Sequence, residues 1–324
     1  MKYHSISHYY RHSNDLSYFV VKMDNKKEYI SGPNFPFVEI TQRNINMLAR
    51  QKGSWGFEEF YKNLMDSPSI EISELNDASY LFYNSKVITS FNMDLPRLKD
   101  AACMFFGCEN LLDFKGNMDN LKVATSMFQG CSSIKHYQSW TPNLEIGNEM
   151  FKHCNQLETI DNGNGFEYTN LVSARNMCSN CNSLNSFDYQ QFPVLQNAQY
   201  MFYQCMNLPS ISIDAPILTQ GAAMCYHCES LESAYVNTPK LYNSTMMFNG
   251  DVVLKVVKLK ADELKKADIM FDNCNSIVVA DFDVPDEVRT KLLSSIGFEH
   301  NSNFGAECKK QVVQSSGISF DVEY

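Results

Sequence analysis

The 324-residue chain lacks the features that would mark a membrane protein, a nucleic-acid-binding protein or a common type of enzyme. No apolar run approaches the roughly 20 residues needed to span a bilayer. No glycine-rich phosphate loop, nucleophile elbow or His-Glu zinc helix is present. Basic residues are few, because 27 Lys and Arg stand against 37 Asp and Glu and give a net charge of −10, which leaves no positive field to attract phosphate backbones. We therefore expect no catalytic residues, no cofactor, no nucleic-acid partner and no membrane insertion.

We expect no secretory leader at the given N-terminus, although a mature exported chain that starts at an artificial Met would look the same. Met1-Lys2-Tyr3-His4-Ser5 is followed by polar and charged residues instead of an apolar signal core, so signal-dependent export is not indicated. We expect a cytoplasmic protein, or a virion-associated one that leaves the cell by assembly into a phage particle and lysis. The 44% of hydrophobic residues predicts that most of the chain is folded.

The clearest positive feature is a repeat of about 23 residues. A methionine followed by phenylalanine or cysteine, with a further cysteine four residues after the methionine in most copies, recurs along the chain. This methionine, here called the repeat methionine, stands at Met104, Met127, Met150, Met177, Met201, Met224, Met247 and Met270, after a degenerate first copy at Leu81. The position six residues earlier tests the frame, and it is leucine in all nine copies: Leu75, Leu98, Leu121, Leu144, Leu171, Leu195, Leu218, Leu241 and Leu264. Chance agreement would be on the order of one in a billion.

Each copy predicts one coil of a solenoid. The Leu, small, Met and Cys positions fall at spacings of three and four, which suits a short α or 3₁₀ helix with an apolar inner edge. The later apolar alternation, as in 208–213 and 254–259, suits a short strand, and the proline that recurs after it ends that strand. One coil cannot bury its own apolar edge, so the copies must stack. We expect an α/β repeat, with a parallel sheet on one face and short helical segments on the other.

This pattern closely resembles the BspA-like class of bacterial leucine-rich repeats over about residues 73–282. The resemblance implies a leucine-rich repeat solenoid. It implies no common chemistry, because the family includes surface adhesins, interaction modules and uncharacterised proteins.

The regions outside the repeat are expected to be terminal pieces. Residues 1–72 form an N-terminal cap or an attachment segment, with a hairpin from 19–23 and 28–30 and a helix around 40–65. Residues 283–324 form a C-terminal cap, whose helix begins near Pro285 and ends near Ile296. One repeat step carries four extra residues around 161–165, which must bulge as a turn. Such a turn is either a tolerated surface insertion or part of a binding edge.

Polar side chains flank the second apolar residue of each predicted strand and should face outward. They are the candidate binding residues, and they suit a protein or glycan ligand, although a solvated face fits the same pattern: Asp113, Lys115, His136, Gln138, Thr159, Asp161, Ser186, Asp188, Ser210, Ser212, Ser233 and Tyr235.

Two C-x-x-C pairs, 178–181 and 225–228, have a spacing that elsewhere indicates zinc or thiol redox chemistry. Here Cys181 and Cys228 are ordinary repeat cysteines, while Cys178 and Cys225 occupy the position of phenylalanine in other copies. The simplest interpretation is a set of buried free thiols, so we predict no metal site.

Two further clusters have ordinary explanations. His4, His8 and His12 would share a face if their stretch were helical, which could make a metal site, but their surroundings do not favour a helix. The lysines between 255 and 266 suit a solvated face.

The leading functional hypothesis is a non-enzymatic binding module for a protein or glycan. The alternatives are a structural component of a large assembly such as a phage particle, or a surface adhesin. The oligomeric state stays open.

Overall fold

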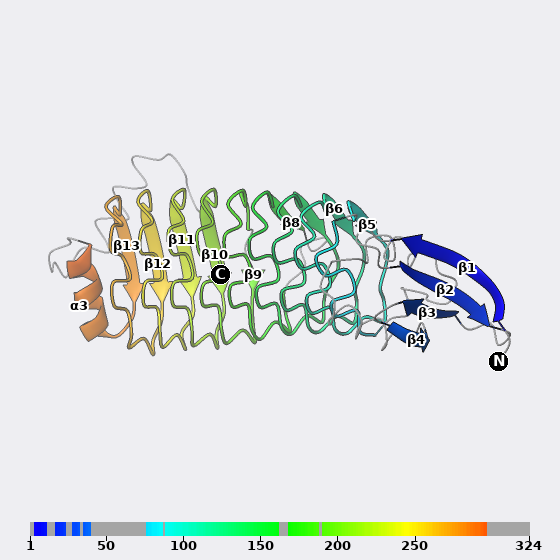
Figure 1. Cartoon of the computed structure of the whole chain (residues 1–324). Coiled ribbons are helices and arrows are strands. Elements are labelled where there is room, and N and C mark those ends of the chain that lie inside the picture. The colour runs from blue at the N-terminus through cyan, green and yellow to red at the C-terminus, as the bar shows by residue number, and fades with distance from the viewer. Residues whose placement is uncertain are drawn as a thin grey trace. The chain divides into compact units, whose positions relative to one another are not determined.

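The computed structural model describes residues 3–11, 17–23, 28–32, 35–39, 76–86, 88–161, 168–187 and 190–296. These residues fall into two compact units, an N-terminal unit (1–166) and a C-terminal unit (167–324) (Figure 1). The predicted helix around 40–65 and the inserted turn at 162–165 lie outside the described residues.

The first part of the N-terminal unit is an antiparallel sheet in the order β1-β2-β3-β4. Its strands are β1 (Tyr3–Arg11), β2 (Ser17–Met23), β3 (Glu28–Gly32) and β4 (Phe35–Glu39). The pairing of β2 with β3 confirms the predicted hairpin. His4 and His8 lie on strand β1, so the helical face that could have grouped the histidines does not form.

The repeat coils of the N-terminal unit place their strands in a parallel sheet in the order β5-β6-β7-β8. The strands β5 (Ser90–Asn92), β6 (Asp113–Lys115), β7 (His136–Gln138) and β8 (Thr159–Asp161) pair in register at steps of one repeat. In β5, β6 and β7 the central residue is buried and its two neighbours are exposed. This alternation is the expected consequence of the two-residue period of a strand with one covered face.

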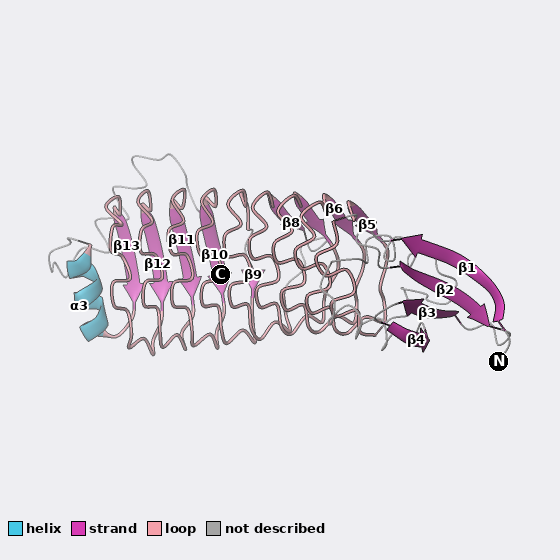
Figure 2. Cartoon of the chain, viewed as in Figure 1, coloured by secondary structure: helices cyan, strands magenta, loops and turns pink. Residues whose placement is uncertain are grey.

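The C-terminal unit contains a second parallel sheet in the order β13-β12-β11-β10-β9, followed by a helix (Figure 2). Its strands are β9 (Gln190–Gln191), β10 (Ser210–Asp214), β11 (Ser233–Asn237), β12 (Val256–Lys260) and β13 (Val279–Asp283). Helix α3 (Asp286–Ser295) begins after Pro285 and is followed by Ile296. The predicted bounds of this last helix are confirmed.

The predicted short helices on the other side of each coil are wrong. Among the described residues α3 is the one α-helix, and the segments around the repeat methionines are turns (Figure 2). In every coil, φ is positive at the residue before the repeat methionine or its equivalent and again four residues later. A right-handed helix requires negative φ throughout, so two left-handed residues in five break it.

The backbone N–H groups of these turns alternate between bonds within the coil and bonds to the neighbouring coil. The N–H of Phe105 donates to the carbonyl of Met127 one coil away at 2.8 Å, whereas the N–H of Met104 donates back to Ala101 at 3.0 Å. Alternate N–H groups repeat this scheme at Phe128 and Met127. The bonds that would have closed a helix therefore tie one coil to the next, which satisfies the buried backbone.

The core of each unit consists of columns of equivalent side chains. In the N-terminal unit, Phe82, Phe105, Phe128 and Phe151 stack with ring centroids 5.2, 5.3 and 5.7 Å apart. The repeat methionines are buried in both units, as are the eight repeat leucines that the structure describes. The predicted alignment of equivalent residues from coil to coil is confirmed within each unit.

Candidate functional site

The predicted binding residues divide between the two sheets. Asp113, Lys115, His136 and Gln138 are exposed beside the buried Phe114 and Tyr137, as their strand positions predicted. The His136 Nδ1 atom is hydrogen-bonded to Thr159 Oγ1 at 3.0 Å. Asp161 ends β8, and its side chain is outside the described part of the structure.

The remaining predicted residues belong to the C-terminal unit. Ser210 is exposed, and Ser212, Ser233 and Tyr235 are half-buried on β10 and β11. Ser186 is half-buried but precedes β9 instead of lying on a strand, and Asp188 is outside the described residues. The pairing of Ile213 with Gln190 shows that this coil has one residue more before its strand than the other coils. Ser186 therefore falls before the strand.

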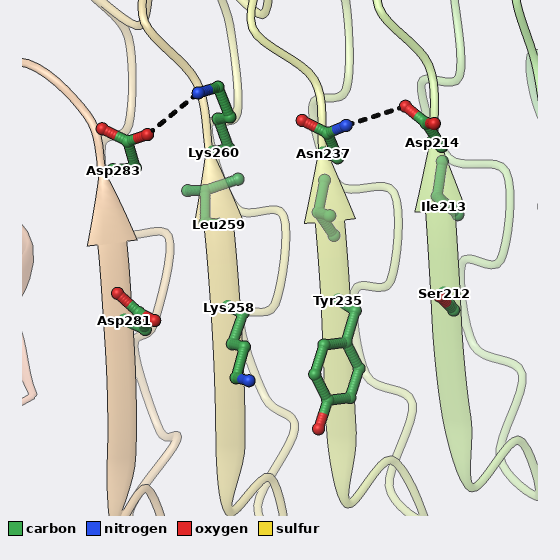
Figure 3. Close-up of a pocket in the computed structure, with 11 residues that line it drawn as sticks. Ser212, Ile213, Asp214, Tyr235, Asn237, Lys258, Leu259, Lys260, Asp281 and Asp283 are labelled. Carbon is green, nitrogen blue, oxygen red and sulfur yellow. Dashed lines mark hydrogen bonds and ion pairs between the residues drawn. The ribbon is translucent and has the colours of Figure 1, made fainter. Parts of the chain in front are cut away.

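A polar groove crosses strands β10 to β13 and encloses about 510 Å³ (Figure 3). We call it the C-terminal groove. Its outward residues come from the same two positions of successive strands: Ser212, Asp214, Tyr235, Asn237, Lys258, Lys260, Asp281 and Asp283. The sequence-based prediction included Ser212 and Tyr235. It missed Asp214 and Asn237 in the second row and the charged residues that continue both rows onto β12 and β13.

Polar groups in the C-terminal groove are bonded across the strands. The Nδ2 atom of Asn237 donates to Asp214 Oδ1 at 2.9 Å, and Lys260 Nζ lies 3.1 Å from Asp283 Oδ2 (Figure 3). This hydrogen bond, which Lys260 donates to Asp283, raises the pKa of Lys260. Lys258 Nζ lies 5.2 Å from the centroid of the Tyr235 ring, a cation–π distance.

A second hollow, of about 560 Å³, lies where strands β5, β6 and β7 end. We call it the Trp140 hollow. It is lined by Asn92, Asp94, Lys115, Gly116, Asn117, Asp119, Gln138, Ser139 and Trp140. Of these, only Lys115 and Gln138 were predicted. The sequence contained two signals for the other residues. Asn92 occupies in the first coil the position that Lys115 and Gln138 occupy in the next two, and Trp140 is one of only two tryptophans.

The floor of the Trp140 hollow is closely packed. A Cβ atom on Gly116 would lie 2.1 Å from the carbonyl oxygen of Met93, so no larger residue fits without movement of the backbone. Asp94 Oδ1 accepts a hydrogen bond from the N–H of Asn117 at 2.8 Å, and Ser139 Oγ donates to the carbonyl of Gly116. These contacts hold neighbouring coil ends in fixed positions.

The lysines of the 255–266 cluster contact acidic or aromatic side chains. Lys255 Nζ lies 3.1 Å from Glu232 Oε2, and the amines of Lys265 and Lys266 lie 5.9 and 5.6 Å from the centroid of the Tyr242 ring. Lys255 is therefore paired with a carboxylate, whereas Lys265 and Lys266 lie over the same aromatic ring.

The repeat cysteines lie inside the coils. The Sγ atoms of Cys108, Cys131 and Cys154 lie 2.9 to 3.1 Å from the carbonyl oxygen at the phenylalanine position one coil earlier. Burial raises the pKa of Cys108 to about 12. Cys178 and Cys225 are fully buried where other coils place phenylalanine. In the described part of the chain, no group of three or more His, Cys, Asp or Glu side chains is arranged to hold a metal ion.

One coil replaces the repeat cysteine with an aspartate, which sequence reasoning missed. Asp251 stands four residues after Met247 and is fully buried. Its Oδ1 atom accepts a hydrogen bond from the N–H of Cys228 at 2.7 Å, while Oδ2 has no partner. Burial and, to a lesser extent, the neighbouring Cys228 raise the pKa of this carboxyl well above its usual value. The break in the cysteine column is the signal that could have identified it.

Comparisons with known proteins give a family match and distant structural matches. The sequence model for the BspA type leucine rich repeat region matches in six copies, over residues 53–171 and 174–278. A search of curated proteins finds no match.

Two solved structures illustrate the distant matches. An internalin from Listeria monocytogenes is 11% identical with a TM-score of 0.32, and the match covers 80% of this chain and 73% of that chain. A leucine rich cell surface protein from Faecalibacterium prausnitzii is 10% identical with a TM-score of 0.33, and the match covers 92% and 99% of the two chains. No helix among the described residues has the length and apolar character required to cross a membrane.

Proposed function

Because the chain belongs to the BspA-type leucine-rich repeat family, we propose that it is a non-enzymatic binding module that holds a protein or glycan partner on its parallel sheets. The observation that carries this proposal is the C-terminal groove. In this groove, two rows of polar and charged side chains line a space of about 510 Å³. The rows come from four strands that pair in register.

The surrounding fold supports binding because the strands cannot easily move apart. Each strand of the groove is hydrogen-bonded to its neighbours along five paired residues, and buried Ile213, Val236 and Leu259 anchor the same stretch from below. Side chains on such a scaffold are already ordered before a ligand arrives, which lowers the entropic cost of binding.

The state of the cysteines supports the non-enzymatic part of the proposal. A cysteine nucleophile or metal ligand acts as a thiolate, and burial raises the pKa of Cys131, Cys205 and Cys225 well above the usual value. These thiols are therefore neutral near pH 7 and suit a structural role.

The test is binding of the purified full chain to a glycan array and to candidate proteins, with every ligand found compared across three variants. Tyr235→Ala and Lys258→Ala alter the C-terminal groove, whereas Asp268→Ala alters an exposed turn residue away from the strands. We expect the first two variants to weaken binding at least about tenfold, roughly 1.4 kcal/mol, and Asp268→Ala to bind like the unmodified chain. Equal binding by all three would overturn the proposal for this groove.

A further inference from the structure

We propose that the Trp140 hollow is a saccharide-binding site, with the indole ring against one face of a sugar ring and the surrounding amides and carboxylates bonded to its hydroxyl groups. This inference rests on the proposed binding function and names the ligand class for a second site, in the N-terminal unit.

The first argument is the unused hydrogen-bonding capacity of the hollow. Within residues 76–86 and 88–161, the side chains of Asn92, Lys115, Asp119 and Gln138 make no hydrogen bond or ion pair with the protein, although all four line the same space. In the C-terminal groove, by contrast, Asn237 is bonded to Asp214 and Lys260 to Asp283 across the strands. The Trp140 hollow therefore offers donors and acceptors to a ligand without first breaking protein contacts.

The second argument is the position of Trp140. Its side chain is 37% exposed at the rim of the hollow, although tryptophan is among the residues that proteins usually bury. An indole combines a flat apolar face with one N–H donor. A sugar ring has the matching combination, because its C–H groups form an apolar face and its hydroxyl groups form a polar edge. An exposed indole beside amides and carboxylates thus fits a saccharide better than a purely polar or purely apolar ligand.

The third argument is charge. The ionisable side chains of the hollow are Asp94, Asp119 and Lys115, which sum to one net negative charge near pH 7. This charge disfavours phosphorylated, sulfated or carboxylated ligands. Asp and Asn oxygens accept hydrogen bonds from hydroxyl groups, and Asn, Gln and Lys nitrogens donate to hydroxyl oxygens. The side chains present therefore favour an uncharged, polyhydroxylated ligand.

The size and shape of the hollow are consistent with an oligosaccharide. Its volume of about 560 Å³ falls within the roughly 300–1,000 Å³ of small-molecule sites. Successive coils repeat the polar positions, so Asn92, Lys115 and Gln138 form a row that can contact consecutive sugar units.

The experiment uses the full chain with Trp55→Phe, which leaves Trp140 as the one tryptophan. Neutral oligosaccharides built from glucose, galactose, mannose or N-acetylglucosamine are titrated while tryptophan emission is recorded, and calorimetry gives the affinity. We expect at least one of them to produce a saturable change in emission. By calorimetry, Trp140→Ala and Asp119→Ala should each weaken its binding at least about tenfold. Tyr235→Ala, in the other groove, is the matched control and should bind with unchanged affinity.

The fold of each variant is checked by its thermal unfolding midpoint, and Trp140→Phe provides a second test because it keeps an aromatic ring and should retain part of the affinity. If none of the oligosaccharides binds, or if Trp140→Ala binds as tightly as the parent, the saccharide inference is wrong. A partner that still depends on Tyr235 and Lys258 would then leave the binding-module proposal standing. Failure of both sets of variants to affect any ligand would remove both proposals.

Discussion

Asp251 should make the stability of the C-terminal unit depend on pH. Its carboxyl is fully buried in the column that cysteines occupy in most other coils, and Oδ2 has no hydrogen-bond partner. We consider Asp251→Cys, which restores the repeat residue, and Asp251→Asn, which keeps an oxygen acceptor for the N–H of Cys228 but cannot ionise.

The magnitude follows from the proton balance. In the unfolded chain the carboxyl has a pKa of about 3.9, and in the folded chain burial raises the pKa well above the usual value. Between these two pKa values the folded chain holds one proton more than the unfolded chain, so the free energy of unfolding falls as pH rises. The slope is about 1.4 kcal/mol per pH unit. This penalty is absent below the unfolded pKa and complete above the folded pKa.

The assay is urea unfolding of the unmodified chain and both variants at pH 5, 6 and 7, followed by circular dichroism. The free energy of unfolding of Asp251→Cys relative to the unmodified chain should increase as pH rises above the unfolded pKa, by at most about 1.4 kcal/mol per pH unit. Asp251→Asn should show the same change in slope, because it also removes the ionisation. Other titrating groups cancel in the difference. Stability profiles that stay parallel across this range would refute the reasoning.

Four other perturbations test the packing of the coils. Phe105→Ala removes a ring from the middle of a stack and should lower the free energy of unfolding by about 3–5 kcal/mol in urea, whereas a loss below about 1 kcal/mol would contradict the stack. Gly116→Ala places a Cβ atom against the carbonyl of Met93 and should lower the thermal midpoint; an unchanged midpoint would contradict this close contact. Ile269 is exposed with a φ of 46°, so Ile269→Asn should raise stability by about 1 kcal/mol, and a decrease would argue against the left-handed turn. The Cys108 thiol, with a pKa of about 12, should react with a disulfide reagent only after unfolding, and rapid labelling of the folded chain would show that it is accessible.

The sequence was sufficient for the strands and the core because both depend on periodic burial. Leu98, Leu121 and Leu144 are buried one coil apart as the leucine column predicted, and β10 and β12 overlap the expected apolar alternations. The start of α3 followed from Pro285 and the acidic residues after it, and its end followed from Gly297 in the sequence. These signals are local and do not depend on how the coils approach each other.

The prediction of helices was wrong because the same apolar spacing also fits a second backbone conformation. Residues three and four apart also point inward in a turn that contains left-handed residues, and neighbouring coils then satisfy the backbone N–H groups. The second left-handed position of each coil contains mostly glycine, asparagine or histidine, the residues that tolerate positive φ: Asn84, Gly107, Gly130, His153, Asn180, Gln204, His227, Gly250 and Asn273. That column was visible in the sequence and argues against a helix.

The candidate sites were only partly predictable. Alternation along a strand placed Lys115 and Gln138 on the surface. It could not show that Asp119 and Trp140, which lie beyond the strands, would line the same hollow. Their proximity depends on the path of the chain after each strand, which includes the tight contact of Gly116 with Met93. Contacts that depend on the path of the chain between strands produce no periodic pattern in the sequence.

Helix α3 lies against the end of the last strand and bonds to its open edge. β13 is the outermost strand of its sheet, and the guanidinium of Arg289 on α3 donates to the carbonyls of Phe282 and Val284 at the end of that strand. A bare parallel edge would act as a template onto which extended segments of other molecules could add, as in fibril growth. By bonding to the end of this edge, α3 helps prevent further strands from adding to a sheet that could otherwise keep growing.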